Sequence, residues 1–168
     1  YGLLFGREAL ADSIFAEVEK NYNNLKALAT SQAVKPRLMC EMKSGSAWYV
    51  SGGRSTTGKL YADAGAEYVF SSYTNAGGVP LSFETVFDKA QDADVWLMKY
   101  NHPTDKTYQS LQEDYAPYAN FKAFKEKNIY HCNTAYRPYY EDFPFHPDRV
   151  LKDLIKIFHP SLLPEYEL

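Results

Sequence analysis

The stretch Val95-Trp96-Leu97-Met98-Lys99-Tyr100-Asn101-His102-Pro103 decides the fold of this chain. Its first four residues, Val95 to Met98, form an apolar run with the length of a buried strand. Tyr100 to Pro103 then predicts a loop that begins where the strand ends. Similar strand-like runs occur at 37–42, 67–70 and 129–132, with helical patterns between them. This alternation predicts an α/β domain, a three-layer lobe whose mostly parallel sheet is flanked by helices.

The helices are predicted from apolar residues that recur at helical spacing and from capping residues that mark the helix ends. The longest runs from Arg7 to about Ala29, with apolar residues on one face and charges on the other. Gly65 marks a helix end and Ser82 a helix start, because Gly adopts the left-handed conformation readily and a Ser hydroxyl caps backbone N–H groups. The other expected elements are an extended piece at 47–50, helices at 55–64, 82–90, 105–114 and 117–125, and a last helix from Pro147 to Pro160 with Leu151, Leu154, Ile155 and Phe158 as its buried stripe.

Aromatic side chains gather around the loops that follow the predicted strands. In an open α/β sheet, ligands bind at the carboxyl ends of the strands. Tyr, Trp and Arg offer flat faces with hydrogen-bonding tips, which suit a large planar ligand with anionic groups. We therefore predict a ligand surface formed by Trp48, Tyr49, Arg54, Tyr73, Tyr100, His102, Tyr136, Arg137 and Tyr139. The alternative is that these side chains pack against a neighbouring domain.

The composition narrows the class of protein. A chain of 168 residues fits one domain, and a net charge of −3 with interspersed Lys and Glu provides no basic stripe for nucleic acid. The apolar runs are too short to cross a membrane. The 15 Tyr and 10 Phe are more than we expect a core alone to use. Cys40 and Cys132 lie near the ends of apolar runs and are expected to be buried free thiols, without metal-ligand spacing to a His.

The segment Gly53-Arg54-Ser55-Thr56-Thr57-Gly58-Lys59-Leu60 contains the G-x-x-x-x-G-K pattern of a phosphate-binding loop. Leu60 occupies the position where a Ser or Thr hydroxyl would bind Mg²⁺. No later predicted strand ends in the Asp that would complete such a metal site. We therefore expect a turn that opens a helix, where Arg54 and the neighbouring hydroxyls could meet an anionic group. A nucleotide-binding enzyme, such as a phosphotransferase, is a minor alternative.

The four histidines are dispersed and show no metal-ligand pairing with Cys or carboxylates. His146 and His159 lie beside prolines at helix boundaries and are expected to cap, and His131 lies in a predicted strand. His102, in the loop after Tyr100, is the only His that we consider for ligand binding. The sequence also has no nucleophile-elbow Ser. We therefore expect a binding protein rather than an enzyme, with no cofactor and no metal site of its own.

Several segments in fixed order carry a family resemblance: Gly2 to Ala29, Trp48-Tyr49-Val50-Ser51-Gly52-Gly53, Tyr61-Ala62-Asp63-Ala64-Gly65-Ala66, Leu81-Ser82-Phe83-Glu84-Thr85-Val86 leading to Asp92-Ala93-Asp94-Val95, and Phe145 to Pro160. Together they resemble the periplasmic binding proteins of metal-chelate ABC importers, the class that carries ferric siderophores, haem or cobalamin. The resemblance covers nearly the whole chain, but only the second half of the family's pattern.

The resemblance implies a domain organisation. Family members have two α/β lobes joined by a long rigid helix, with the ligand between the lobes. Residues 1–30 would then be the linking helix and residues 31–168 the carboxy-terminal lobe. An amino-terminal lobe and a lipoprotein or secretion signal are expected before Tyr1. The implied location is the periplasm, or the outer side of the inner membrane for an anchored lipoprotein.

The resemblance also implies the partners. Glu84 corresponds to the acidic side chain with which such a lobe docks on an Arg of the ABC permease; the alternative is a carboxylate that only meets the helix dipole. The ligand would be a small metal chelate. Arg54 and Arg137 favour an anionic siderophore, while Tyr49, Tyr73, Tyr100 and His102 keep haem and cobalamin open. Outside this family, a purely structural interaction lobe is the remaining alternative.

Overall fold

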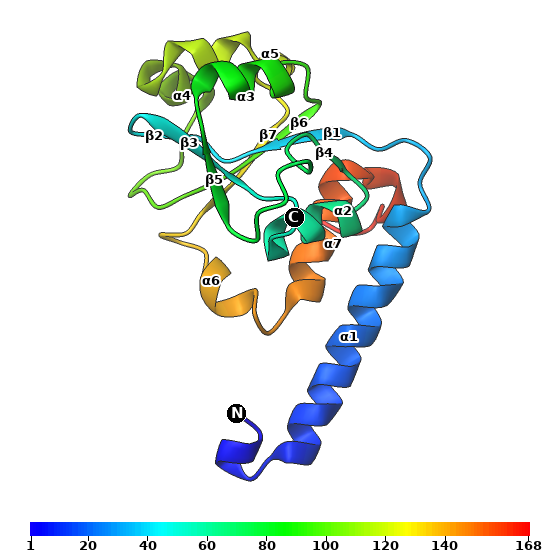
Figure 1. Ribbon diagram of the computed structural model, residues 1–168. Coiled ribbons are helices and arrows are strands. Elements are labelled where there is room, and N and C mark those ends of the chain that lie inside the picture. The colour runs from blue at the N-terminus through cyan, green and yellow to red at the C-terminus, as the bar shows by residue number, and fades with distance from the viewer.

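The computed structural model describes residues 1–168 and contains two sheets with helices on both sides (Figure 1). The larger sheet is entirely parallel, in the order β4-β1-β6-β7. Its strands are β4 (Glu67–Tyr68), β1 (Arg37–Cys40), β6 (Val95–Tyr100) and β7 (Ile129–Asn133). The smaller sheet is antiparallel, with β2 (Lys43–Ser44), β3 (Ala47–Ser51) and β5 (Gly78–Leu81). The predicted α/β class and parallel sheet are confirmed.

The helices form the two outer layers. Figure 1 shows α1 (Glu8–Thr30), α2 (Thr56–Asp63) and α7 (Pro147–Phe158) on one side of the parallel sheet. The other side is covered by α3 (Phe83–Ala90), α4 (Tyr108–Asp114) and α5 (Lys122–Lys125). The short helices are η1 (Leu3–Phe5), η2 (Ala116–Asn120), α6 (Tyr139–Asp142) and η3 (Pro160–Leu162). The α7 stripe of Leu151, Leu154, Ile155 and Phe158 is buried, as predicted.

Local capping follows the sequence signals. The Ser55 hydroxyl accepts a hydrogen bond from the Gly58 N–H at 3.0 Å, and the Ser82 hydroxyl accepts one from the Thr85 N–H at 3.2 Å. Gly65 has φ +81°, the left-handed conformation predicted for it. A Cβ there would lie 2.6 Å from His159 Nε2 and 2.7 Å from the Ala29 carbonyl oxygen. The junction of α1, α2 and α7 therefore has no room for a side chain at position 65.

Several predicted elements differ from the structure. The helix expected at 117–125 is instead the 3₁₀ helix η2 and the short helix α5, separated by the extended residue Phe121. The extended piece at 47–50 does not join the parallel sheet but forms the middle strand of the antiparallel one. Strand β5 was not predicted from the sequence, where its segment lies between the expected strand at 67–70 and the expected helix at 82–90. Since β5 is an edge strand, its Pro80 is tolerated.

An aromatic cluster fills the core between the sheet and helices α3 to α5. The rings of Trp48, Trp96, Tyr118 and Phe121 are almost fully buried, and their centroids lie 5.1 to 5.7 Å apart. The indole N–H of Trp48 donates to the Cys40 carbonyl at 3.0 Å, so burial leaves it paired. Part of the aromatic surplus is therefore used in the core, since side chains of this size bury a large apolar area.

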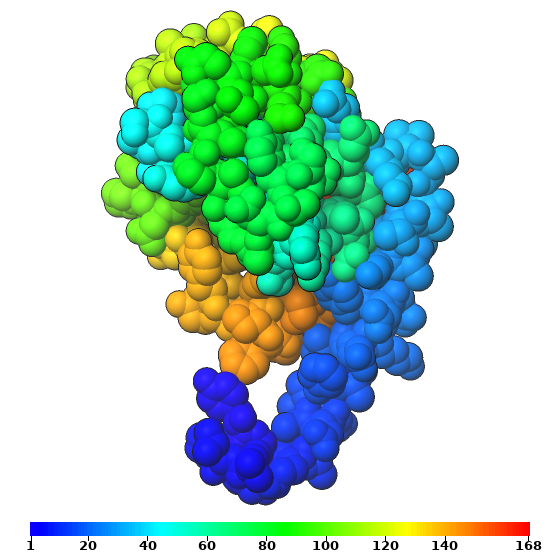
Figure 2. Space-filling view, in the orientation of Figure 1, coloured from blue at the N-terminus to red at the C-terminus, as the bar shows by residue number.

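Helix α1 extends away from the rest of the chain (Figures 1 and 2). Its carboxyl half is attached to α2, because the Tyr22 hydroxyl donates to Asp63 at 2.8 Å and the Lys26 ammonium lies 3.0 Å from the same carboxylate. In its amino half, Ile14 and Phe15 are 48% and 68% exposed. The predicted helix is confirmed, but half of its apolar face has no cover within this chain. None of the helices combines the length and apolar character needed to cross a membrane.

Candidate ligand-binding site

The candidate site lies where the neighbouring strands β6 and β7 end. Tyr100 and Asn133 are the last residues of these strands and are paired in register. The loops that follow begin at Asn101 and at Thr134, so the parallel arrangement brings both to the same edge of the sheet. This edge carries five of the predicted residues: Tyr100, His102, Tyr136, Arg137 and Tyr139.

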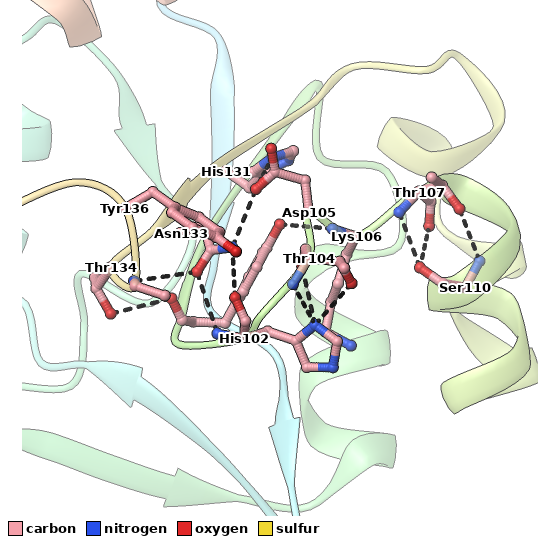
Figure 3. Close-up of polar contacts among 12 residues, drawn as sticks. His102, Thr104, Asp105, Lys106, Thr107, Ser110, His131, Asn133, Thr134 and Tyr136 are labelled. Atoms are coloured by element: carbon pink, nitrogen blue, oxygen red, sulfur yellow. Dashed lines mark hydrogen bonds and ion pairs between the residues drawn. The ribbon is translucent and has the colours of Figure 1, made fainter.

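Asn133 is the residue that joins the two loops (Figure 3). Its side chain is only 4% exposed, and its Oδ1 accepts from the backbone N–H groups of His102 at 3.1 Å and Ala135 at 3.2 Å. Its Nδ2 donates to the His102 carbonyl at 2.8 Å and to Asp105 Oδ1 at 3.1 Å. A buried amide with donors and acceptors all used fixes its neighbours in position. Asn133 therefore sets the loop that presents His102 relative to the loop that presents Tyr136 and Arg137.

Tyr100 is half-buried beneath these loops. Its hydroxyl accepts from the Lys106 N–H at 2.9 Å, and its ring lies 5.4 Å from the His131 ring. Burial, opposed by the hydrogen bond from Lys106, raises the pKa of the Tyr100 hydroxyl above its ordinary value. Tyr100 therefore supports this edge as a neutral phenol.

His102 and Tyr136 are the exposed side chains of the joined loops. The Nδ1 of His102 is engaged by Thr104, whose carbonyl oxygen lies at 2.9 Å and whose N–H lies at 3.3 Å. Its Nε2 is then the nitrogen left for a ligand. The Tyr136 hydroxyl donates to the Pro103 carbonyl, and 63% of this residue is exposed. This hydrogen bond holds the Tyr136 ring beside the loop that carries His102 (Figure 3).

Tyr139 begins helix α6 and is partly buried. Its ring stacks on Phe143 with centroids 5.5 Å apart, and the Lys99 ammonium lies 5.8 Å from its centroid. Burial raises the pKa of the Tyr139 hydroxyl, and the Lys99 charge opposes this shift. Arg137, two residues earlier, is exposed, as a side chain that meets an anionic ligand must be.

Arg54 and Tyr73 belong to a second part of the same edge. The Tyr73 carbonyl accepts from the Gly53 N–H at 2.7 Å, so the loop after β4 lies beside the turn that carries the exposed Arg54. The ring of Tyr73 contacts Phe70, with centroids 6.5 Å apart, and the Lys89 ammonium at 5.6 Å. These partners differ from those of Tyr100 and Tyr139. The predicted ligand-binding residues at this edge therefore form two groups rather than one continuous surface.

Two candidates lie elsewhere. Trp48, in the extended piece predicted at 47–50, was expected on the ligand surface, but it lies inside β3 and is 0% exposed, so this assignment is wrong. The physical reason is the alternation of β3, which turns Trp48 and Val50 into the aromatic core and Tyr49 outward. Tyr49 is 55% exposed on the outer face of the antiparallel sheet, where it pairs with Pro80.

The glycines of the turn before α2 have a packing explanation. A Cβ at Gly53 would lie 2.1 Å from the Ser71 carbonyl oxygen, and one at Gly52 would lie 2.1 Å from that of Asn75. The Ser55 hydroxyl is occupied, because it donates to the Gly52 carbonyl at 2.6 Å and caps α2. Gly is therefore required here by close backbone approach, and of the polar side chains expected to meet an anion, Ser55 is not free to do so.

Glu84 lies at the start of α3, outside the candidate site, with an exposed side chain. Hydrogen bonds from its own backbone N–H and from the Ser82 hydroxyl lower the pKa of its carboxyl group. The carboxylate is thus ionised over a wide pH range.

Sequence reasoning missed Asn133 and an ion pair between Glu41 and Lys99. Glu41 directly follows β1, and Lys99 is the second-last residue of β6, the neighbouring strand. Both carboxylate and ammonium are largely buried. Each of the two apolar runs has a charged residue at its carboxyl end, and the two charges have opposite signs. Because a parallel sheet can place these ends side by side, this pattern was an available signal for an ion pair.

Comparison with known proteins identifies the family. A family model described as periplasmic binding protein matches residues 1–136. The chain therefore belongs to the periplasmic binding protein family, whose members bind substrates. An uncharacterized lipoprotein of Methanocaldococcus jannaschii is 27% identical over 165 residues, which is 96% of this chain and 37% of that protein.

Solved structures share the fold. A possible iron-binding, periplasmic solute-binding protein from Staphylococcus epidermidis ATCC 12228 matches with TM-score 0.69 and 18% identity, over 93% of this chain and 57% of that one. The protein IsdE of S. aureus, complexed with heme, matches with TM-score 0.70 and 18% identity, over 94% of this chain and 60% of that one. The chain thus spans between about a third and three fifths of the length of these relatives.

Proposed function

We propose that this chain is the linking helix and carboxy-terminal lobe of the substrate-binding component of an ABC importer. This component would capture an iron chelate, a siderophore or haem, and deliver it to the permease. The observation that carries the proposal is the edge formed by Tyr100, Tyr136 and Arg137, which Asn133 fixes at the carboxyl ends of β6 and β7. In open α/β sheets this is the edge where ligands bind.

The chemistry of the edge supports a chelate with anionic groups. Exposed aromatic faces suit the planar parts of such a ligand, and Arg137 can make paired hydrogen bonds to its carboxylate or phenolate oxygens. Two structures with this fold are described as possibly iron-binding and as complexed with heme. A chelate of iron is therefore the class that we propose, with cobalamin as the ligand to compare in the assay.

The two-lobe organisation is supported by α1. Its residues Leu10, Ile14 and Phe15 are between 48% and 68% exposed, which is unusual for an amphipathic helix that has its full set of neighbours. The matched relatives are also much longer than this chain. We propose that residues 1–30 link residues 31–168 to an amino-terminal lobe, in a periplasmic or lipid-anchored protein that performs no catalysis.

The ligand assay uses the full-length protein. Titration calorimetry with a ferric siderophore, haem and cobalamin should show tight binding of one iron chelate. Residues 1–168 alone should bind the same chelate far more weakly, because a single lobe contacts less of the ligand surface and does not enclose the ligand. Equal affinity in the two proteins would contradict the two-lobe proposal. Failure of every chelate to bind would favour the structural interaction lobe.

Permease docking is tested through Glu84. We propose that this ionised, exposed carboxylate meets an Arg of the permease. Glu84→Lys reverses a charge at the interface, and like charges there cost on the order of several kcal/mol. Transport should collapse while chelate affinity stays nearly constant. Glu113→Lys, which reverses an exposed carboxylate on α4, is the control and should transport normally. Loss of ligand affinity in Glu84→Lys would place this residue in the ligand site instead.

A further inference from the structure

The Glu41–Lys99 ion pair lies at the same edge of the sheet as the candidate site. Lys99 precedes Tyr100 on β6 and is paired in register with Cys132 on β7. Its ammonium contacts the Glu41 carboxylate, and the two side chains are 18% and 19% exposed. Because side chains alternate along a strand, Lys99 points to the opposite face from Tyr100.

Glu41 is held in an unusual backbone conformation. Its φ of +62° is in the left-handed region, which non-glycine residues seldom occupy. Three contacts fix it there: its N–H donates to the Leu97 carbonyl at 2.7 Å, its carbonyl accepts from the Trp96 indole at 2.7 Å, and the preceding carbonyl of Cys40 accepts from Trp48. Backbone held in a sparsely populated conformation by surrounding structure is concentrated at functional sites. The aromatic core thus fixes the carboxylate that meets Lys99.

The Lys99 ammonium also has hydrogen-bonding capacity left. It has three N–H donors, and the acceptor that the structure gives it is the Glu41 carboxylate. On its other side lies the ring face of Tyr139, at 5.8 Å. An ammonium in this position can keep Glu41 and bind one further oxygen, because its donors rotate about a flexible stem.

Arg137 is the second cation near this position. The Arg137 N–H donates to the Asn133 carbonyl at 3.1 Å, and the Arg137 carbonyl accepts at 2.8 Å from the N–H of Tyr139, the residue whose ring contacts Lys99. Cys132 is one residue before Asn133, which orients the loop of Arg137. The two cations therefore flank the carboxyl end of β7, one fixed by Glu41 and one exposed.

We propose that Lys99 selects ligands by charge, and that Lys99 and Arg137 together bind the carboxylate groups of an anionic ferric chelate. Tyr139 covers Lys99 and moves aside or stacks on the chelate when it binds. Glu41 holds the ammonium in place and partly neutralises it, so that the site accepts a chelate with few negative charges. This inference rests on the proposed function, because it assigns the charge of the ligand of the same site.

A purely structural ion pair is the competing explanation. Replacing a buried ion pair by neutral groups is often neutral for stability, whereas removing one partner leaves an uncompensated charge. A structural pair would affect every ligand alike, through stability. A charge-selecting lysine affects ligands according to their charge, and this difference is the basis of the experiment.

The experiment titrates the full-length protein with two probes: the ferric complex of citrate, which is negatively charged, and the ferric complex of a linear trihydroxamate, which carries no negative charge. Lys99→Gln should weaken ferric citrate binding at least about tenfold, and trihydroxamate binding less than about twofold. Lys99→Arg should restore most of the citrate affinity. Glu41→Gln should strengthen citrate binding, because it removes a like charge from the site.

Controls separate charge selection from stability. Lys122→Gln removes a lysine that is paired with Asp94 at the other end of the sheet, and it should leave both affinities unchanged. The double variant Glu41→Gln with Lys99→Gln contains no unpaired buried charge, and it should lose citrate affinity as Lys99→Gln does, even where the single variant folds poorly.

Three results would overturn the inference. They are an equal loss for both probes in Lys99→Gln and in the double variant, weaker citrate binding in Glu41→Gln, and a wild-type protein that binds the trihydroxamate but not the citrate complex. A wild-type protein that binds neither probe would also overturn this inference, whereas the proposed function fails only if haem and the other chelates fail to bind as well.

Discussion

Two aromatic clusters of this molecule use the same residue types in different ways. In the core, Trp48, Trp96 and Tyr118 contact one another, and the polar atoms of these rings bond to backbone groups inside the protein. At the carboxyl edge, Tyr100 and Tyr139 have one face toward Lys106 and Lys99, and Tyr136 is mostly exposed. The core rings contribute stability, whereas at the edge Tyr136 leaves most of its surface exposed. The following predictions test this division.

The largest effect is expected in the core. Trp96→Ala should lower the free energy of unfolding by about 3–5 kcal/mol, because it leaves a cavity among Trp48, Tyr118 and Phe121. The measurement is urea denaturation of the full-length protein. Tyr140→Ala, at a residue that is 65% exposed beside the edge cluster, is the control and should change stability by about 0.5 kcal/mol or less. Similar losses in the two variants would contradict the division.

Asn133→Ala should have an intermediate effect, because it breaks the connection between the two loops of the site. Loss of a buried partner for the His102 and Ala135 N–H groups should cost about 1–3 kcal/mol. Amide hydrogen exchange at His102 and Ala135 should become faster, and chelate affinity should fall.

Asn133→Asp separates the two halves of this amide. It keeps the acceptor for both N–H groups but places a carboxylate beside Asp105 and the His102 carbonyl, in place of the donor that now meets them at 3.1 and 2.8 Å. Protection of His102 and Ala135 should therefore persist while the Asp105 side moves away. Unchanged exchange in Asn133→Ala would show that the loops are held by other contacts.

The sequence predicted the parallel sheet, the caps at Ser55, Ser82 and Gly65, and the buried stripe of α7, because these depend on local periodicity and backbone preference. It assigned Trp48 to the ligand surface, because the alternation along a strand separates Trp48 from Tyr49 but does not show which of the two faces the core. It missed Asn133 and the Glu41–Lys99 pair, since their roles depend on which strands become neighbours. The roles of Glu84 and of the ligand residues remain predictions.

The two cysteines allow a test by pH. Burial raises the pKa of the Cys40 thiol from 9.0 to about 11, although its Tyr68 neighbour opposes this shift. A group whose pKa is raised by folding adds stability below its unfolded pKa, and this stability is lost as pH rises from 9 through 11. Between pH 9 and 10, unfolding should become easier by about 1 kcal/mol from this group. Cys40→Ala should flatten this part of the stability curve.

Cys132 is the matched comparison at the edge. It is partly buried, and the Lys99 and Arg137 charges oppose the rise in its pKa. Cys132→Ala should therefore flatten the same curve less than Cys40→Ala does. The measurement is urea denaturation at half-unit steps of pH. An effect of Cys132→Ala that equals or exceeds that of Cys40→Ala would show that the edge thiol is as isolated from charge and solvent as the core thiol.

The smallest effect is expected from a single hydroxyl at the edge. Tyr136→Phe removes the hydrogen bond to the Pro103 carbonyl, but this residue is 63% exposed, so water can replace the lost donor. The free energy of unfolding should fall by about 0.5 kcal/mol or less.

Tyr118→Phe is the matched variant in the core. It removes the hydroxyl that accepts from the Lys43 N–H at 2.9 Å, and its cost should be about 1 kcal/mol or more, because the buried rings around it admit no water. Tyr136→Phe should also leave chelate affinity within about twofold, since the ring face rather than the hydroxyl is proposed to meet the ligand. Urea denaturation and calorimetry of the two variants measure both quantities, and a Tyr136→Phe variant that lost as much stability as Tyr118→Phe would mean that the edge ring is part of the packed structure and not a free face.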